Sequence, residues 1–284
     1  MLSQVGRFFA EAKAPNPFAR KVPPQNVKHI ILAASCKGGV GKSTVAMNTA
    51  IALTKQGMRV GLFDADLYGP SVPTMTLTSD SSLVMTQENK FLPVYVNGLE
   101  TVSIGNAVKK EDALLWKGPA VGGLITQLLK DSLWSELDYL IIDTPPGTGD
   151  VHLALYDAVP IDGAILVTSP QNVAMADVIR NVDMFKKMRI PVLGLVRNFD
   201  GFVCPCCGEV TKIFQGQKAD EMAKENKYEV LGSIPIDPAI AKAADSGIPA
   251  IDQAPDSAYA KVFQNIAKKI IEKVPKDSKP RGTK

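Results

Sequence analysis

The sequence predicts an α/β fold: a mostly parallel, doubly wound sheet with helices on both of its faces. Continuous apolar segments alternate with helical patterns from residue 28 onward, and strands buried on both faces are typical of parallel sheets. A glycine-rich loop at residues 37–44 lies between the first apolar segment and the first helical pattern. With 284 residues, 45% of them apolar, the chain is long enough for one large domain.

The expected strands cover residues 30–34, 59–64, 102–105, 139–143, 164–168 and 192–196. Ligands of such sheets bind beyond the carboxyl ends of the strands, so polar residues at those ends are the candidates for a site. A last helical pattern covers residues 256–273, and its apolar positions form a stripe. That stripe predicts a helix that packs on the domain.

The two ends of the chain differ from the domain expected over residues 28–273. Residues 1–27 are basic and contain several prolines, which predicts either a remnant of a mitochondrial presequence or a disordered N-terminal arm. Residues 274–284 are polar and are expected to form a disordered tail.

Charge and hydropathy exclude some classes of partner. The net charge is only +3 and the lysines are spread along the chain, so no nucleic-acid partner is expected. No apolar segment approaches the roughly 18 residues of a membrane span, so no stable membrane insertion is expected. The cysteines at positions 36, 204, 206 and 207 are too clustered for a disulfide framework and suit a reducing compartment.

The glycine-rich loop has the composition of a phosphate-binding loop. Its glycines let successive N–H groups point at an anion, and the following helix adds the positive end of its dipole. Lys42 is expected to contact the β- and γ-phosphates, and the Ser43 hydroxyl to ligate Mg²⁺. The expected nucleotide-binding residues are Lys37, Gly38, Gly39, Val40, Gly41, Lys42, Ser43 and Thr44.

One residue departs from the plain G-x-x-x-x-G-K-[ST] pattern, and a second lysine is added within it. Cys36 replaces the first glycine, and Lys37 adds a second lysine. With this lysine the loop resembles that of the deviant P-loop ATPases, the group related to MinD, ParA and the nitrogenase iron protein. The resemblance implies a nucleotide-dependent dimer in which Lys37 contacts phosphate across the interface.

Carboxylates follow two of the expected strands. Asp143 ends the segment Leu140-Ile141-Ile142 and is the candidate for the acidic residue near Mg²⁺. Asp66 is placed to orient or activate the attacking water. For Asp64 the alternative to a role in catalysis is that it only caps or stabilises the loop. These residues can also be ordinary strand-end caps, although both are followed by Gly/Pro-rich loops. With Lys37 and Lys42, Asp66 and Asp143 make up the expected catalytic set.

Asn198 is expected at the end of a strand. Its amide can donate to and accept from a purine edge, which would read adenine. A turn-initiating asparagine is the alternative.

Cys204 and Cys207 form a C-x-x-C pair within the loop of residues 199–213. Three interpretations compete: a thioredoxin-like redox pair, a closed zinc site, and a site shared between two chains. The β-branched residues after the pair do not indicate the helix of a redox motif. One chain offers no second C-x-x-C pair, so four ligands for zinc or for a [4Fe–4S] cluster require a second chain. Cys206 is either a spare thiol or an alternative ligand.

Four ordered motifs together resemble the Mrp/ApbC family of iron–sulfur carrier ATPases, over residues 27–273. They are residues 37–44, 64–73 (Asp-Ala-Asp-Leu-Tyr-Gly-Pro-Ser-Val-Pro), 143–150 (Asp-Thr-Pro-Pro-Gly-Thr-Gly-Asp) and 204–207 (Cys-Pro-Cys-Cys). The resemblance implies ATP and Mg²⁺ binding, slow regulatory hydrolysis, and a [4Fe–4S] cluster held by Cys204 and Cys207 of two protomers. The dimer would be a homodimer or a heterodimer with a relative.

Residues 184–214 resemble the mitochondrial branch of the family, which is implicated in complex I assembly. This implies apo iron–sulfur proteins as recipients and the mitochondrial matrix as the compartment, with a cytosolic iron–sulfur scaffold ATPase as the alternative. Phe199-Asp200 replaces the usual Met-Ser of the family. The rival function is a MinD- or ParA-like ATPase switch whose cysteines bind structural zinc.

Overall fold

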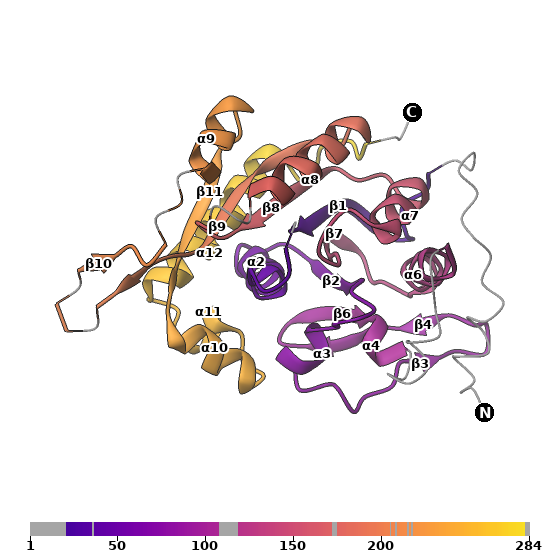
Figure 1. Cartoon of the computed structure of the whole chain (residues 1–284). Helices are drawn as coiled ribbons and strands as arrows, with labels where there is room; N and C mark the ends of the chain where they lie inside the picture. The colour runs from indigo at the N-terminus through magenta and orange to yellow at the C-terminus, as the bar shows by residue number, and fades with distance from the viewer. Residues whose placement is uncertain are drawn as a thin grey trace.

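The fold is a mostly parallel sheet with helices on both faces, as the sequence predicts (Figure 1). The structure is a computed structural model that describes residues 21–281 except residues 36, 108–118, 172–174, 205, 208, 215 and 217. In this part of the chain the main sheet has nine strands, in the order β10-β9-β8-β1-β7-β2-β6-β5, with β11 paired to β9. All neighbours are parallel except the pairs β5–β6 and β9–β10.

The strands of the main sheet are β1 (Val27–Ala34), β2 (Val60–Asp64), β5 (Val94–Val96), β6 (Leu99–Ser103), β7 (Leu137–Asp143), β8 (Gly163–Thr168), β9 (Val192–Val203), β10 (Val210–Thr211) and β11 (Val230–Ile236). Two short strands, β3 (Val84–Met85) and β4 (Phe91–Leu92), pair separately.

Helices cover the two faces of the sheet (Figure 1). One face packs against α2 (Lys42–Lys55), α10 (Pro238–Asp245), α11 (Ala250–Gln253) and α12 (Ala258–Lys273). The other packs against α6 (Pro119–Asp131), α7 (Asp150–Ala158), α8 (Met175–Lys187) and α9 (Lys218–Glu225). The short helices α3 (Val72–Met75) and α4 (Ile104–Ala107) follow β2 and β6.

The central strand β1 shows why the strands are continuous apolar segments. Ile30 and Leu32 belong to the core under α6, α7 and α8, whereas Ile31 and Ala33 belong to the core under α2 and α12. Successive side chains of a strand point to opposite faces, so a strand covered on both sides needs apolar residues at every position.

The register of the central strands places the predicted site residues at one edge. Ala33 pairs with Asp143, Asp143 pairs with Asp64, and Asp64 pairs with Ser103. These positions lie at the carboxyl ends of β1, β7, β2 and β6, where parallel α/β sheets bind ligands.

Two strand predictions were wrong in their limits. The strand expected at residues 102–105 begins at Leu99 and ends at Ser103, and Ile104 begins the short helix α4. The strand expected to end near Asn198 continues to Val203 as β9. It continues because β11 supplies backbone partners along this stretch, with Ile234 opposite Asn198 and Ile236 opposite Phe202.

The C-terminal helix α12 packs on the domain, as its apolar stripe predicts. Tyr259, Phe263, Ile266 and Ile270 are buried against the α2 side of the sheet. Within the described residues, no helix is long and apolar enough to cross a membrane. After α12, the Val274 carbonyl accepts a 2.6 Å hydrogen bond from the Tyr139 hydroxyl.

Candidate functional site

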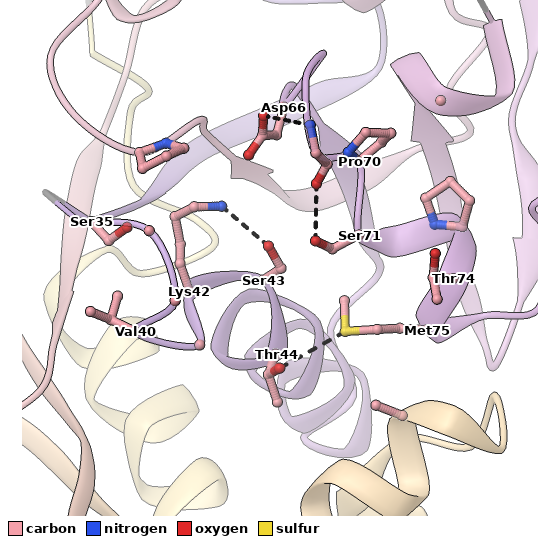
Figure 2. A pocket seen from close by; sticks show the side chains of 18 of the residues that line it. Ser35, Val40, Lys42, Ser43, Thr44, Asp66, Pro70, Ser71, Thr74 and Met75 are labelled. Carbon is pink, nitrogen blue, oxygen red and sulfur yellow. Dashed lines mark hydrogen bonds between the residues drawn. The ribbon is translucent and has the colours of Figure 1, made fainter. Parts of the chain in front are cut away.

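An open cleft of about 750 Å³ lies at the carboxyl edge of the sheet. The loop of residues 37–44 forms one wall, and residues after β2 form the opposite wall (Figure 2). Lys42 and Ser43 face Asp66 across the cleft (Figure 2). All eight predicted nucleotide-binding residues of the loop line this cleft.

Gly41 is a position where the loop requires glycine. It has a φ of 78° and is the N-cap of α2, a conformation that other residues adopt at a cost. A Cβ atom here would lie 2.2 Å from the Asn198 amide nitrogen. The first turn of α2 has no acidic residue and no side-chain cap, so its N–H groups and dipole are available to an anion.

The Lys42 ammonium group donates a hydrogen bond to the Asp143 carboxylate, and it lies 3.2 Å from the Ser43 hydroxyl oxygen. Lys42 is 6% exposed and Asp143 is fully buried. Burial raises the pKa of Asp143, and the charge of Lys42 opposes that rise. Lys42 therefore compensates a carboxylate that would otherwise be an isolated buried charge.

The second oxygen of Asp143, Oδ2, is buried and has no hydrogen-bond partner among the described residues. A buried acceptor without a partner is costly unless a ligand satisfies it. With the nearby Ser43 hydroxyl it provides the hard oxygen donors that Mg²⁺ prefers. The residues thus fit a magnesium ion bound beside a nucleotide phosphate.

Asp64 differs from Asp143, although the two pair directly across β2 and β7. Its carboxylate accepts hydrogen bonds from the N–H groups of Asp66 and Val72 and from the Ser103 hydroxyl, each at 3.1 Å. Burial and the Asp143 charge raise the pKa of Asp64. Its contacts join the ends of β2 and β6 to α3, which is consistent with a residue that stabilises the loop after β2.

Asp66 lines the cleft from the loop after β2. Its Oδ1 atom accepts a hydrogen bond from the Gly69 N–H at 3.2 Å, which orients the carboxyl group. The carboxylate remains half-exposed at the cleft, so it is accessible to a water molecule.

His152 is a buried residue near the site for which the sequence indicated no partner. Its Nε2 atom lies 3.0 Å from the Thr144 hydroxyl, and that hydroxyl donates to the Ala33 carbonyl. Burial and the charge of Lys42 lower the pKa of His152 to about 4. The neutral imidazole thus braces the residue that follows Asp143.

Asn198 contacts the phosphate-binding loop from behind. Its amide donates a 2.8 Å hydrogen bond to the Val40 carbonyl, and it is 5% exposed. It is not among the residues that line the cleft. In this structure the amide supports the loop backbone, and its predicted contact with adenine stays a prediction.

The cysteine pair lies outside the cleft, on the hairpin formed by β9 and β10. Figure 1 shows this hairpin projecting from the body of the domain. The Cys204 N–H donates to the Glu209 carbonyl at 2.9 Å, which closes the hairpin. Cys204 is half-buried, Cys206 and Cys207 are exposed, and all three are free thiols.

The backbone N–H of Cys207, followed by that of Cys206, lowers the pKa of the Cys204 thiol by hydrogen bonding. N–H groups that point at a sulfur stabilise a thiolate, the form that binds metal. In the part of the chain that the structure describes, no three His, Cys, Asp or Glu side chains gather as a metal site. Cys36 lies outside the described residues.

One wall of the cleft was not expected from the sequence. Ala241, Ala244 and Asp245 of α10 line it, and α10 contacts α3, which contributes Thr74 and Met75 to the same cleft. The local signal for this helix is present, because Asp237 caps its N-terminus and Pro238 occupies its first turn. Its position beside the phosphate-binding loop depends on tertiary packing.

Comparison with known proteins identifies the family of this chain. The model of a family described as "ParA: NUBPL iron-transfer P-loop NTPase" matches residues 26–271. The chain belongs to this family. The match confirms the predicted P-loop NTPase fold and the resemblance to the iron–sulfur carrier ATPases.

Individual relatives agree with this assignment. An iron–sulfur cluster transfer protein NUBPL of Dictyostelium discoideum is 42% identical over 91% of this chain and 80% of its own length. An iron–sulfur cluster carrier protein of Aquifex aeolicus is 46% identical over 88% of this chain and 69% of its own length. A nucleotide-binding protein of Archaeoglobus fulgidus, solved with ADP, is 36% identical with a TM-score of 0.68, over 79% of this chain and 88% of that one.

Proposed function

We propose that this protein is an ATP-binding iron–sulfur carrier that holds a [4Fe–4S] cluster between two protomers and delivers it to apoproteins. The observation that carries the proposal is the projecting hairpin with Cys204 and Cys207, on a domain whose phosphate-binding loop fits a nucleotide. The similarity to proteins described as cluster carriers and as a cluster transfer protein supports it.

Nucleotide binding is supported by the geometry of the cleft. The uncapped N-terminus of α2 and the left-handed Gly41 provide a cradle for phosphates. When Mg²⁺ and phosphates bind, Lys42 would exchange its contact with Asp143 for the phosphates, and Asp143 would face the metal directly or through water. The accessible carboxylate of Asp66 would orient the attacking water, with hydrolysis slow and regulatory.

The number of available ligands supports a shared cluster. A [4Fe–4S] cluster needs four protein ligands, and the hairpin of one chain offers Cys204 and Cys207. A two-fold axis near the hairpin would supply the same pair from a second chain, in a homodimer or a heterodimer with a relative. The exposed Lys37 lies at the mouth of the cleft, where such a partner would bring its own phosphates into reach.

Recipients and compartment complete the proposal. We propose apo iron–sulfur proteins as recipients, respiratory complex I subunits among them, and the mitochondrial matrix as the compartment. The basic pattern of residues 1–27 supports this compartment; the cytosol is the alternative.

The experiment is anaerobic reconstitution followed by transfer of the cluster to a purified apo [4Fe–4S] protein, with and without ATP. We expect a brown protein that activates the acceptor faster than free iron and sulfide do. A colourless protein that holds stoichiometric zinc and transfers nothing would instead support the ATPase switch with structural zinc.

A further inference from the structure

Phe199 has a backbone conformation that a phenylalanine rarely adopts. Its φ is 61°, and it is the only aromatic residue with a positive φ in the described part of the chain. Bulky residues are rarely found in this left-handed region, because their side chains crowd the backbone there. Such a conformation persists only where the surrounding structure imposes it, so its contacts are informative.

The contacts of Phe199 lie on the phosphate-binding loop. A Cβ atom on Gly41 would lie 3.5 Å from the Cζ atom of the Phe199 ring. The ring also lines a hollow of about 350 Å³ that is walled by residues 37–40 of the loop and by Phe214. The preceding residue, Asn198, holds the Val40 carbonyl.

The other end of the same segment is the cysteine hairpin. β9 continues from Phe199 to Val203, and Cys204 follows at once. Phe202 and Val203 pair with Thr211 and Val210 of β10. Phe199 is therefore the point where the strand that carries the cysteines contacts the loop that would carry the nucleotide.

The start of this segment is held in place. The Arg197 side chain donates to the Ser233 hydroxyl at 3.0 Å and forms an ion pair with Asp200 at 3.3 Å. β11 pairs with β9 on both sides of Phe199, with Ile234 opposite Asn198 and Ile236 opposite Phe202, and the register shifts between these two pairs. A movement of the loop at Val40 and Gly41 would therefore be taken up in the irregular stretch between the pairs, which begins at Phe199. The left-handed Gly201, with a φ of 88°, is the next point of backbone freedom.

We propose that Phe199 is a positioning residue that couples nucleotide binding at the loop to the orientation of the cysteine hairpin. This coupling rests on the proposed carrier function, and it assigns the control of cluster release by nucleotide to one side chain. Phosphates would draw the loop N–H groups inward, and the loop would then press on or release the Phe199 ring. Because packed elements transmit small shifts, the hairpin would change its angle and with it the lability of the cluster.

Phe199→Asn tests the ring, because asparagine tolerates the left-handed conformation but removes the aromatic contact. Arg189→Asn is the matched control: Arg189 is also left-handed, with a φ of 54°, but precedes β9 at its opposite end and is exposed. The readout is the half-time of cluster removal by a chelator, measured with and without ATP on reconstituted protein.

In the wild type and in Arg189→Asn we expect ATP to change this half-time at least about fivefold. In Phe199→Asn the ratio of the half-times with and without ATP should fall to about one. The iron content and the ATP dissociation constant of this variant should stay within about threefold of wild type. A ratio that stays at the wild-type value in Phe199→Asn would overturn the inference, as would a wild-type ratio of one.

A second measurement needs no cluster and separates this inference from the carrier function. In the cluster-free chain, ATP should change the hydrogen exchange of amides in residues 202–211 of the wild type, but not of Phe199→Asn or Phe199→Leu. An equal change in all three chains would overturn the inference, whether or not the protein carries a cluster. If the wild-type chain shows this change but takes up no iron, the coupling stands and the carrier function falls.

Discussion

The ammonium group of Lys42, the first residue of α2, donates a hydrogen bond to the buried carboxylate of Asp143, the last residue of β7. The contact joins the phosphate-binding loop to the end of β7. Lys42 therefore compensates the charge of Asp143, and under the proposed function it would also contact a phosphate.

We predict that Lys42→Ala abolishes ATP binding and also destabilises the fold. The variant loses the point charge for the β- and γ-phosphates and leaves Asp143 as an uncompensated buried charge, which costs about 3–5 kcal/mol in a closed site and less beside an open cleft. Calorimetric titration with ATP and thermal unfolding check the two effects. Lys55→Ala, which breaks the half-exposed Lys55–Asp252 pair at the other end of α2, should cost about 0–1 kcal/mol and retain ATP binding.

The three aspartates should separate in their effects. Asp66→Asn should leave ATP binding and the melting temperature unchanged and lower ATP turnover about a hundredfold, because general base catalysis contributes at least that much. Asp143→Asn should instead weaken Mg²⁺-dependent binding. Asp64→Asn should lower the melting temperature, because an amide cannot accept hydrogen bonds at both of its former oxygen positions. Wild-type turnover in the Asp66 variant would remove this residue from the catalytic set.

The buried His152 predicts a pH dependence of stability. Its folded-state pKa of about 4 lies below the ordinary 6.5, so the unfolded chain binds a proton that the folded chain excludes. The stability from His152 is present above pH 6.5 and is lost as the pH falls from there toward 4. The raised pKa of Asp64 acts in the opposite direction, but it is common to wild type and a His152→Gln variant and cancels in their comparison.

We therefore expect the stability advantage of wild type over His152→Gln to shrink by about 1–3 kcal/mol between pH of about 7 and about 4.5. Urea unfolding at the two pH values measures it. An advantage that stays constant over this range would show that His152 is not held neutral in the folded protein.

A chain that begins at Gln25 should keep the stability of the whole protein. It retains all of β1 and the 3.1 Å hydrogen bond from the Asn26 amide to the Trp134 carbonyl. It loses Lys21, whose ammonium group lies 3.0 Å from the centre of the Tyr156 ring, a contact worth about 0.5–1 kcal/mol at an exposed site. A fall in the melting temperature of more than about 5 °C would show that residues before Gln25 pack on the domain.

The sequence predicts those parts of the fold in which the local pattern of apolar and glycine residues matches the burial and backbone conformation of the structure. β1, β7 and β8 each contain a continuous apolar segment because both faces of the sheet are covered. Gly41 is glycine because φ is positive and Asn198 leaves no room for a Cβ atom. The sequence therefore located the glycine-rich loop before α2 and the carboxyl ends of β2 and β7 correctly.

Other features depend on partners distant in the sequence. The Asn198–Val40 contact joins residues 158 positions apart and requires β9 to extend along β11. Asp64 and Asp143 both end strands, and only the N–H and hydroxyl groups that converge on Asp64 assign it a structural role. The left-handed Phe199 lies where the register of β9 and β11 shifts, between the pairs Asn198–Ile234 and Phe202–Ile236, and no local pattern indicates it.

The most direct test of the account is the iron content of reconstituted protein whose oligomeric state is known. A [4Fe–4S] cluster bridged through Cys204 and Cys207 predicts about two irons per chain and about four per dimer. Cys204→Ala and Cys207→Ala should each lose the cluster and the cluster-dependent dimer, and Cys206→Ala should keep both. Light scattering with iron and sulfide analysis measures these quantities. Four irons on a strict monomer, or a cluster that survives the loss of Cys207 but not of Cys206, would contradict the bridged cluster.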